Sequence, residues 1–328
     1  MINPRKSPDL IMIDVTQLRH LCFQIFVGSE LPRIEHYSSK RNGDSITFLV
    51  VGDWGRGGYF NQSRVASQMG RIGKELDIDF VISTGDNFYD NGLKGVDDPA
   101  FHTSFTKIYT AKSLQTPWYI GNHDYQGNAL AQLSPELKKI DPRWNCGRNF
   151  IVGAGIVDII FIDTNPLVNK YFDNPKKQKF DWRGILPREK YISALQKNLD
   201  MELSKSKAPW KIVVGHHTMK SIGYHGDTLE IVDHLLPILE AHKVDMYING
   251  HDHCLEHLSN KMGSMQFFTS GGGSKAWKNE IHYEMHKGST HFYYDGQGFM
   301  SVKLSYEKAK IEFYDVYGKS LYYLKLKP

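Results

Sequence analysis

The chain has 328 residues, of which 41% are hydrophobic, and a formal net charge of +4. This length and composition suit one large domain or two small ones with a well-packed core. No apolar run approaches the roughly 18 residues of a membrane-spanning helix. The Lys and Arg residues are scattered, which disfavours a nucleic-acid partner and is compatible with small anionic substrates.

Residues 1–29 are expected to be a leader or a disordered N-terminal segment. Leu21–Val27 is a short, mainly apolar stretch that follows Arg19-His20 and ends in Gly28-Ser29. These are elements of a secretory signal, although the stretch lies late in the segment. The remainder, residues 30–328, is predicted to form a single catalytic domain.

Downstream, apolar runs typical of strands alternate with segments of helical periodicity. The expected strands are Ile46–Val51, Phe80–Ser83, Trp118–Ile120, Ile156–Ile162, Lys211–Val214, Val244–Ile248 and Met265–Thr269. The expected helices are about Gln62–Leu76, Glu189–Ser204 and Leu229–His242. With a β-rich end from Gly298 to Leu326, this order predicts a layered α/β fold with mixed sheets, or a β-sandwich core, flanked by helices.

Four local patterns add detail to this outline. Asp227 and Glu230 have the spacing of a capping box at the start of the third helix. Asn165–Pro187, with three prolines and many charges, is expected to be a long surface loop. Gly271–Gly273 lacks the Lys and Ser/Thr of a phosphate-binding loop, so a strand-end turn is expected there. Val316–Gly318 is expected to be a turn between two C-terminal strands.

Five of the expected strands are each followed by a glycine and a residue of a metal-ligating type. The five sequences are Gly52-Asp53, Gly85-Asp86, Gly121-Asn122-His123, Gly215-His216 and Gly250-His251-Asp252-His253, and Tyr89 lies three residues after the second. In open α/β sheets, ligands bind just beyond the carboxyl ends of strands. The first three motifs are 33 and 36 residues apart and the last two are 35 apart. Each interval suits one strand–helix–strand crossover, so we expect the motifs to meet at one sheet edge, which predicts a metal site at the carboxyl ends of the strands.

The blocks GDWG, GDNFY, GNHD, VVGHH and GHDH resemble the motifs of the metallophosphoesterases, and specifically of the purple acid phosphatases. The likeness is to the small plant type, which is related to mammalian tartrate-resistant acid phosphatase, and it covers about Glu30 to the C-terminus. Tyr89 is the specific mark, since protein Ser/Thr phosphatases and cyclic-nucleotide phosphodiesterases of this superfamily lack a tyrosine ligand there. The resemblance implies an acid phosphatase that hydrolyses phosphate monoesters, with hydroxide bound at two metal ions as the nucleophile.

The resemblance also implies which residues bind the two ions. Ferric iron, Fe(3+), would be bound by Asp53, Asp86, Tyr89 and His253. Zn(2+), Mn(2+) or Fe(2+) would be bound by Asp86, Asn122, His216 and His251, with Asp86 bridging the two ions. The residue types agree with this division, because a phenol with a pKa near 10 binds as phenolate at low pH only to a strongly Lewis-acidic ion. Imidazoles with one amide and one carboxylate suit a borderline divalent ion.

The remaining histidines receive roles from the same resemblance. His225 is expected to protonate the leaving alkoxide, and His123 is expected to assist it. The expected substrate contacts are Asn122, His123, His217 and His225. His217 is a weaker candidate, because its side chain should point away from that of His216 in extended backbone. Asp252 is expected to be structural, orienting a ligand histidine.

Other functions remain open at this point. A phosphodiesterase or protein phosphatase of the same superfamily is one alternative, and a peroxidase-like side activity of the iron is another. A non-catalytic binding protein is disfavoured, because a decayed site should have lost at least one ligand. The expected partners are small phosphate monoesters, with no nucleic acid and no membrane span, and the expected state is a monomer.

Localisation and covalent modification are inferred from the resemblance and from isolated residues. The resemblance implies a secreted or vacuolar protein. Asn61-Gln62-Ser63 is a glycosylation sequon that matters only if the chain is secreted. Without residues 1–29, the cysteines left are Cys146 and Cys254, which are compatible with one disulfide or with two buried thiols.

Overall fold

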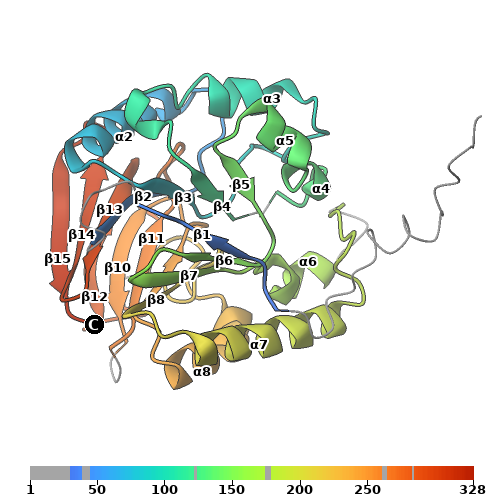
Figure 1. Cartoon of the computed structure of the whole chain (residues 1–328), viewed down its shortest axis with the longest axis vertical. Helices are drawn as coiled ribbons and strands as arrows, with labels where there is room; N and C mark the ends of the chain where they lie inside the picture. Colours follow the sequence, from blue (N-terminus) through green and yellow to red (C-terminus); the bar gives the residue numbers. More distant parts are fainter. Residues whose placement is uncertain (1–29, 39–44, 122–123, 174–178, 261–263, 283) are drawn as a thin grey trace, which may run out of the picture.

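The computed structural model describes residues 30–38, 45–121, 124–173, 179–260, 264–282 and 284–328. Within these ranges, two β-sheets face each other and helices cover their outer faces (Figure 1). One sheet has eight strands, in the order β1 (Arg33–Glu35), β6 (Phe150–Gly153), β7 (Val157–Phe161), β8 (Trp210–Val214), β9 (Met246–Asn249), β11 (Gln266–Ser270), β10 (Leu255–Ser259) and β12 (Thr290–Tyr294). The other has seven, in the order β15 (Ser320–Leu326), β14 (Ala309–Asp315), β13 (Gly298–Ser305), β2 (Ser45–Val51), β3 (Phe80–Ser83), β4 (Trp118–Ile120) and β5 (Trp144–Cys146).

Both sheets are mixed, and each has a parallel part that ends at the site described below. In the seven-stranded sheet, β2, β3, β4 and β5 are parallel neighbours, whereas β13, β14 and β15 are antiparallel. In the eight-stranded sheet, β7, β8, β9 and β11 are parallel neighbours. The carboxyl ends of the parallel strands therefore lie together within each sheet.

Strand β2 shows how the layers are stabilised. Phe48 and Val50 point into the core between the two sheets, whereas Leu49 and Val51 point into a second core beneath the helices. Successive side chains alternate between the two faces of a strand, and here both faces are covered. This explains why β2 reads as a continuous apolar run instead of an alternating one.

The helices cover the outer faces of the two sheets. Helix α2 (Gln62–Leu76) buries Val65 and Met69 against the seven-stranded sheet. Helices α7 (Arg188–Lys205) and α8 (Leu229–Ala241) lie side by side over the eight-stranded sheet, at the bottom of Figure 1. The apolar residues of all three helices recur at the spacing that places them on one face.

Shorter elements complete the fold. They are α3 (Pro99–Phe101), the π-helix η1 (His102–Thr106), the 3-10 helices η2 (Lys112–Leu114) and η3 (Asn165–Leu167), α4 (Ala129–Gln132), α5 (Pro135–Ile140) and α6 (Lys170–Asp173). Among the described residues, none of the helices has the length and apolar character needed to cross a membrane.

The predicted fold class is confirmed: the molecule has mixed sheets that form a sandwich core with flanking helices. The seven predicted strands correspond to β2, β3, β4, β7, β8, β9 and β11, and the three predicted helices to α2, α7 and α8, with ends that differ by at most two residues. Strands β1, β5, β6, β10 and β12 were not predicted. Each is only three to five residues long, and none is followed by a glycine and a ligand-type residue, the signal that marked the equally short β3 and β4.

The predicted capping box at the start of α8 is wrong. Thr228 is the N-cap residue, and its side chain makes no capping hydrogen bond. The Glu230 carboxylate accepts from the backbone N–H of Asn169 at 2.9 Å, and the Asp227 carboxylate accepts from that of Ser221 at 3.0 Å. Glu230 thus binds a segment 61 residues away in the chain, and Asp227 binds the loop that precedes the helix, so neither carboxylate caps α8.

The other local predictions have mixed outcomes. Asn165–Pro187 is not a surface loop in its first part, because η3 and Val168 are buried and α6 follows them. Gly271–Gly273 directly follows β11, so the predicted strand-end turn is confirmed. The predicted turn around Gly318 lies between β14 and β15 and is also confirmed.

Candidate metal centre

The crossover spacing predicted that the five motifs meet at a single sheet edge. In the structure they lie in two sheets instead. Asp53 and Asp86 follow the neighbouring strands β2 and β3 of the seven-stranded sheet. His216 and His251 follow the neighbouring strands β8 and β9 of the eight-stranded sheet. The site therefore forms where the carboxyl ends of two sheets meet.

Backbone hydrogen bonds join the two sheets at this point. The N–H of Gly52, after β2, donates to the carbonyl of Ser270 in β11 at 2.7 Å. The N–H of Gly273 donates back to the carbonyl of Gly52 at 3.0 Å. The glycines permit the approach, since a Cβ on Gly273 would lie 2.4 Å from that same carbonyl oxygen.

Three of the expected ligands have an unusual backbone conformation. Asp53, Asp86 and His251 have φ values of 60°, 48° and 69°, in the left-handed region that non-glycine residues seldom adopt. Such conformations persist where surrounding structure determines them, and they are concentrated at functional sites. Here the N–H of Asp53 donates to the carbonyl of Gly85 at 3.0 Å, and that of His251 donates to Asp53 Oδ2 at 3.1 Å.

The four residues expected to bind ferric iron converge on the hydroxyl of Tyr89. This hydroxyl donates to Asp86 Oδ2 at 2.7 Å and lies 3.0 Å from both Asp53 Oδ1 and His253 Nε2. His253 Nε2 also lies 3.4 Å from Asp53 Oδ1. Two carboxylates, a phenol and an imidazole thus present their ligand atoms to one point.

Two residues expected at the second ion lie beside this group. One ligand atom each from Asp53, Asp86 and His216 lie within 4.8 Å of one another, and His216 Nε2 is 3.9 Å from Asp86 Oδ1. His216 Nδ1 lies 3.1 Å from the carbonyl oxygen of Thr84, a contact that directs Nε2 toward the carboxylates. The His251 ring lies 5.2 Å from that of His216, between centroids. Asn122, the remaining expected ligand of this ion, and His123, an expected substrate contact, lie outside the described residues.

The electrostatics of the site favour a bound cation. Burial raises the pKa of Asp53, and the charge of Asp86 raises it further. Burial, together with the negative charge of Asp86, raises the pKa of Asp124 to about 7. Burial raises the pKa of Asp252 to about 6. A cluster of acids at this depth needs positive charge to ionise, and bound metal ions supply that charge. The residues present therefore fit a metal centre.

Arg56 is a further residue of the site that the sequence patterns did not identify. Its guanidinium carbon lies 3.6 Å from the centroid of the Tyr89 ring, and Nη1 forms an ion pair with Asp90 at 3.0 Å. A cation over the ring face stabilises negative charge on the phenol, which favours the ligating form of Tyr89. The only sequence signal was its position directly after the first motif.

The structure shows which groups surround His217 and Asp252. The His217 ring is fully buried, and its Nδ1 and Nε2 lie 2.8 Å from the hydroxyls of Thr164 and Tyr171, respectively. The ring also packs against those of His216 and His251, and a contact of His217 with substrate stays a prediction. Asp252 does not orient a ligand ring; its carboxylate accepts from the hydroxyl of Ser221 and from the backbone N–H of His225 at 2.8 Å.

His225, the expected proton donor, packs against one of the expected metal ligands. Its ring stacks on that of His251 with 4.0 Å between centroids and 18° between planes. With its backbone bound to Asp252 and its ring packed on an expected ligand, the imidazole is fixed beside the centre.

The segment that follows His123 is anchored on both sides. The Asp124 carboxylate accepts from the backbone N–H groups of Asn87 and Phe88, at 2.9 and 3.0 Å. The hydroxyl of Tyr125 binds the buried carboxylate of Asp163, next to Arg148. These contacts connect the segment to the β3 loop and to the end of β7.

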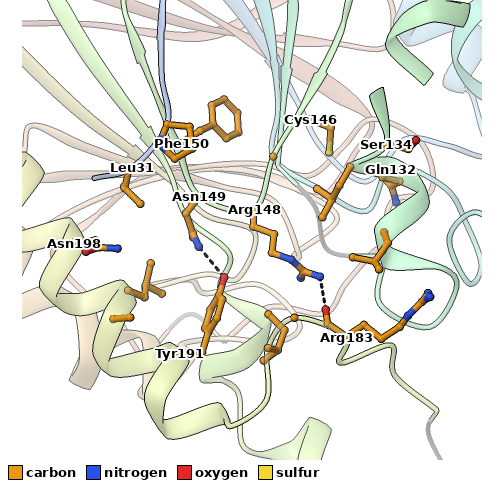
Figure 2. Close-up of a pocket in the computed structure, with 18 of the residues that line it drawn as sticks. Leu31, Gln132, Ser134, Cys146, Arg148, Asn149, Phe150, Arg183, Tyr191 and Asn198 are labelled. Carbon is orange, nitrogen blue, oxygen red and sulfur yellow. Dashed lines mark hydrogen bonds between the residues drawn. The ribbon is translucent and has the colours of Figure 1, made fainter. Parts of the chain in front are cut away.

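Arg148 belongs to the wall of a pocket of about 940 Å³ (Figure 2). In Figure 2 its side chain reaches the carbonyl of Arg183, which accepts at 2.8 Å, and Asn149 donates to the hydroxyl of Tyr191 at 2.7 Å. The pocket also borders Cys146, and Cys146 and Cys254 are both free thiols.

Comparisons with known proteins agree with this geometry. Residues 46–255 match the family of calcineurin-like phosphoesterases. The chain is 59% identical over 290 residues to purple acid phosphatase 3 of Arabidopsis thaliana, covering 88% of this chain and 79% of the relative. It is 31% identical to tartrate-resistant acid phosphatase type 5 of Sus scrofa, covering 86% of each chain. In fold it is similar to GAP50, the anchor in the inner membrane complex of Plasmodium, with a TM-score of 0.71, 27% identity and coverage of 86% of this chain and 89% of that one.

The fold and the cluster of acids and histidines at the meeting of two sheets define a phosphoesterase of the calcineurin-like class. Within that class, the identity to plant relatives over most of the chain is decisive, and the chain belongs to the purple acid phosphatases.

The closeness of Gly250 to Asp53 gives a testable prediction. A Cβ on Gly250 would lie 2.4 Å from Asp53 Oδ2, so Gly250→Ala should displace this carboxylate and lower both the metal content and the phosphatase activity. Gly95 has nothing within 4 Å of an added Cβ, and Gly95→Ala is the matched control, with no loss expected. Metal analysis of the purified variants measures the effect. A full metal complement in Gly250→Ala would contradict it.

The buried carboxyl of Glu256 predicts a pH dependence of stability. Burial raises its pKa from 4.5 to about 8. Because the folded state binds this proton more tightly, the group contributes most stability below about pH 4.5, and the contribution is lost as the pH rises through about 8. Glu256→Gln should therefore flatten the dependence of the unfolding free energy on pH across this window.

Urea unfolding at several pH values measures this slope. Glu307→Gln, at an exposed turn position, is the control and should keep the wild-type slope. An unchanged slope in Glu256→Gln would show that the carboxyl does not titrate in this range.

Proposed function

We propose that this protein is an acid phosphatase that hydrolyses phosphate monoesters at a binuclear metal centre formed by Asp53, Asp86, Tyr89, Asn122, His216, His251 and His253. Membership of the purple acid phosphatases supports the phosphatase activity and the binuclear centre. The observation that carries the residue assignment is the convergence of Asp53, Asp86 and His253 on the hydroxyl of Tyr89.

The chemistry of the donors supports different ions at the two positions. Asp53, Asp86 and Tyr89 offer hard oxygen atoms, together with one imidazole from His253, and this set suits ferric iron. His216, His251 and the amide of Asn122, with Asp86 shared, suit Zn(2+), Mn(2+) or Fe(2+). Arg56 supports the phenolate form of Tyr89, because its cation lies over the ring. When bound, the two ions supply Lewis acidity that activates a water molecule and neutralises charge on the phosphoryl oxygens.

The protein's own residues position the substrate and deliver a proton. His225 lies beside the proposed ligand His251 and is the proposed donor to the leaving oxygen, with His123 assisting. Asp252 holds the backbone of His225, so the imidazole stays in place while the ester oxygen departs. General acid catalysis by an imidazole requires its protonated form, so the rate is expected to fall as the pH rises and His225 loses its proton.

We further propose that the protein acts outside the cytosol, as a secreted or vacuolar enzyme. The family resemblance supports this destination, and the exposed position of Asn61 is compatible with glycosylation of its sequon. A fluorescent fusion of the full chain in plant cells tests it, and retention in the cytosol would contradict it.

The proposed ferric site predicts the colour of the protein. Charge transfer from the Tyr89 phenolate to ferric iron should give a pink to purple tint, and Tyr89→Phe should bleach it while the fold is retained. Tyr306→Phe alters an exposed tyrosine and should keep the colour. The measurement is the visible spectrum together with metal analysis. A colourless, active wild type that contains only zinc would refute the ferric assignment.

The proposed role of His225 predicts how its loss depends on the leaving group. His225→Ala should reduce the rate about 10²-fold or more on esters of alkyl alcohols, the usual worth of general acid catalysis. The rate of nitrophenyl phosphate hydrolysis should fall much less, because nitrophenolate leaves without a proton. The alkaline limb of the pH–rate profile should also flatten.

Steady-state rates on the two substrate classes across the pH range measure this prediction. His102→Ala removes an exposed histidine of η1 and is the control. If His225→Ala lowered the rate equally on alkyl esters and on nitrophenyl phosphate, another group would have to donate the proton.

A further inference from the structure

Two aromatic residues outside the expected ligand set lie beside the proposed proton donor. The ring of Trp277 stacks on His253 with 3.9 Å between centroids and 7° between planes. It also meets His225 edge to face at 5.1 Å and 73°. Tyr224 contacts both, at 5.1 Å from Trp277 and 4.9 Å from His225. The donor imidazole is therefore flanked by two aromatic rings.

Hydrogen bonds connect the segments that carry these rings. The N–H of His282 donates to the carbonyl of Ile222 at 2.7 Å. His286 Nε2 pairs with the carboxylate of Asp227 at 2.7 Å. His282 and His286 of the loop after β11 are thus bound to the segment around His225, which places this loop against it.

The same surface exposes apolar side chains. Tyr224 is 51% exposed and Met285 is 49% exposed. Met285 lies next to the donor segment, since a Cβ on Gly226 would be 3.4 Å from its terminal methyl carbon. Exposed apolar groups that gather beside a catalytic group are typical of ligand-binding surfaces. Support of His225 alone would not require Tyr224 to be half exposed.

The leaving group of the ester has to pass this surface. The oxygen that leaves must lie next to the imidazole that protonates it, so the carbon skeleton attached to that oxygen extends past His225. Tyr224 and Trp277 are the rings that contact His225 from outside the ligand set. An aromatic leaving group gains stacking or edge-to-face contacts there, whereas a short alkyl group gains little.

We propose that Tyr224 and Trp277 form a contact surface for the leaving group, which makes the enzyme selective for phosphate monoesters of aromatic and arylalkyl alcohols. The inference rests on the proposed function and names the substrate class of the same site. Both residues are specificity-determining: they act by contact with the leaving group and not by moving a proton. Sequence patterns do not indicate this role, because Trp277 lies in a polar loop without a motif.

The test compares benzyl phosphate with ethyl phosphate. The two alcohols have similar acidity, so the ratio of their kcat/KM values reports contacts with the leaving group and not its departure. Tyr224→Leu and Trp277→Leu should each lower the benzyl-to-ethyl ratio on the order of three- to tenfold, the range of one aromatic contact. Tyr306→Leu removes a tyrosine that is 57% exposed on another part of the chain, and it should keep the wild-type ratio.

A binding measurement separates this inference from the proposed function. Competitive inhibition by benzylphosphonate and ethylphosphonate, in which a C–P bond replaces the ester and prevents hydrolysis, should favour the benzyl compound, and the two variants should lose this preference. If kcat/KM fell equally on both esters, or if the benzyl-to-ethyl ratio stayed unchanged in both variants, the inference would be overturned. The proposed phosphatase activity would still stand. A wild type that hydrolyses neither ester would refute the proposed function instead. Metal analysis of Trp277→Leu shows whether His253 still binds, and Tyr224→Leu tests the inference without altering a contact to an expected ligand.

Discussion

The candidate site depends on the close contact between the carboxyl ends of two sheets. The N–H of Gly273 donates to the carbonyl of Gly52 there, and a side chain on Gly273 would not fit. The seven-stranded sheet brings Asp53, Asp86 and Tyr89, whose oxygens are hard ligands. The eight-stranded sheet brings the imidazoles of His216, His251 and His253. In the proposed centre each ion takes donors from both sheets, so the centre would form only where the two sheets pack together.

The buried acids of the site place a second constraint on the fold. Burial raises the pKa of Asp53, Asp124 and Asp252, which means that ionising them costs free energy unless a cation is near. The left-handed backbone of Asp53, Asp86 and His251 adds local strain. The apolar cores on both faces of each sheet offset these costs. A sandwich with buried strands thus supports a site that would not be stable on an exposed loop.

Much of this arrangement could be predicted from the sequence, because glycine and a ligand-type residue mark the end of a strand wherever they follow an apolar run. That pattern located Asp53, Asp86, His216 and His251, and periodicity located α2, α7 and α8. It did not show that the strands belong to two sheets, since crossover spacing is the same in both. Nor did it identify Arg56, Trp277 or the partners of Asp252 and His217. Those depend on contacts between segments far apart in the chain, for which a single sequence carries no periodic signal.

The division of the donors between two sheets also couples metal supply to folding. The strands that carry Asp53 and Asp86 lie in the first half of the chain, and those that carry His216 and His251 lie in the second half. Ions that bind only the docked sheets stabilise the native state by mass action, in proportion to the logarithm of their free concentration. The maturation of the protein is thereby linked to the metal content of the compartment in which its two halves first meet.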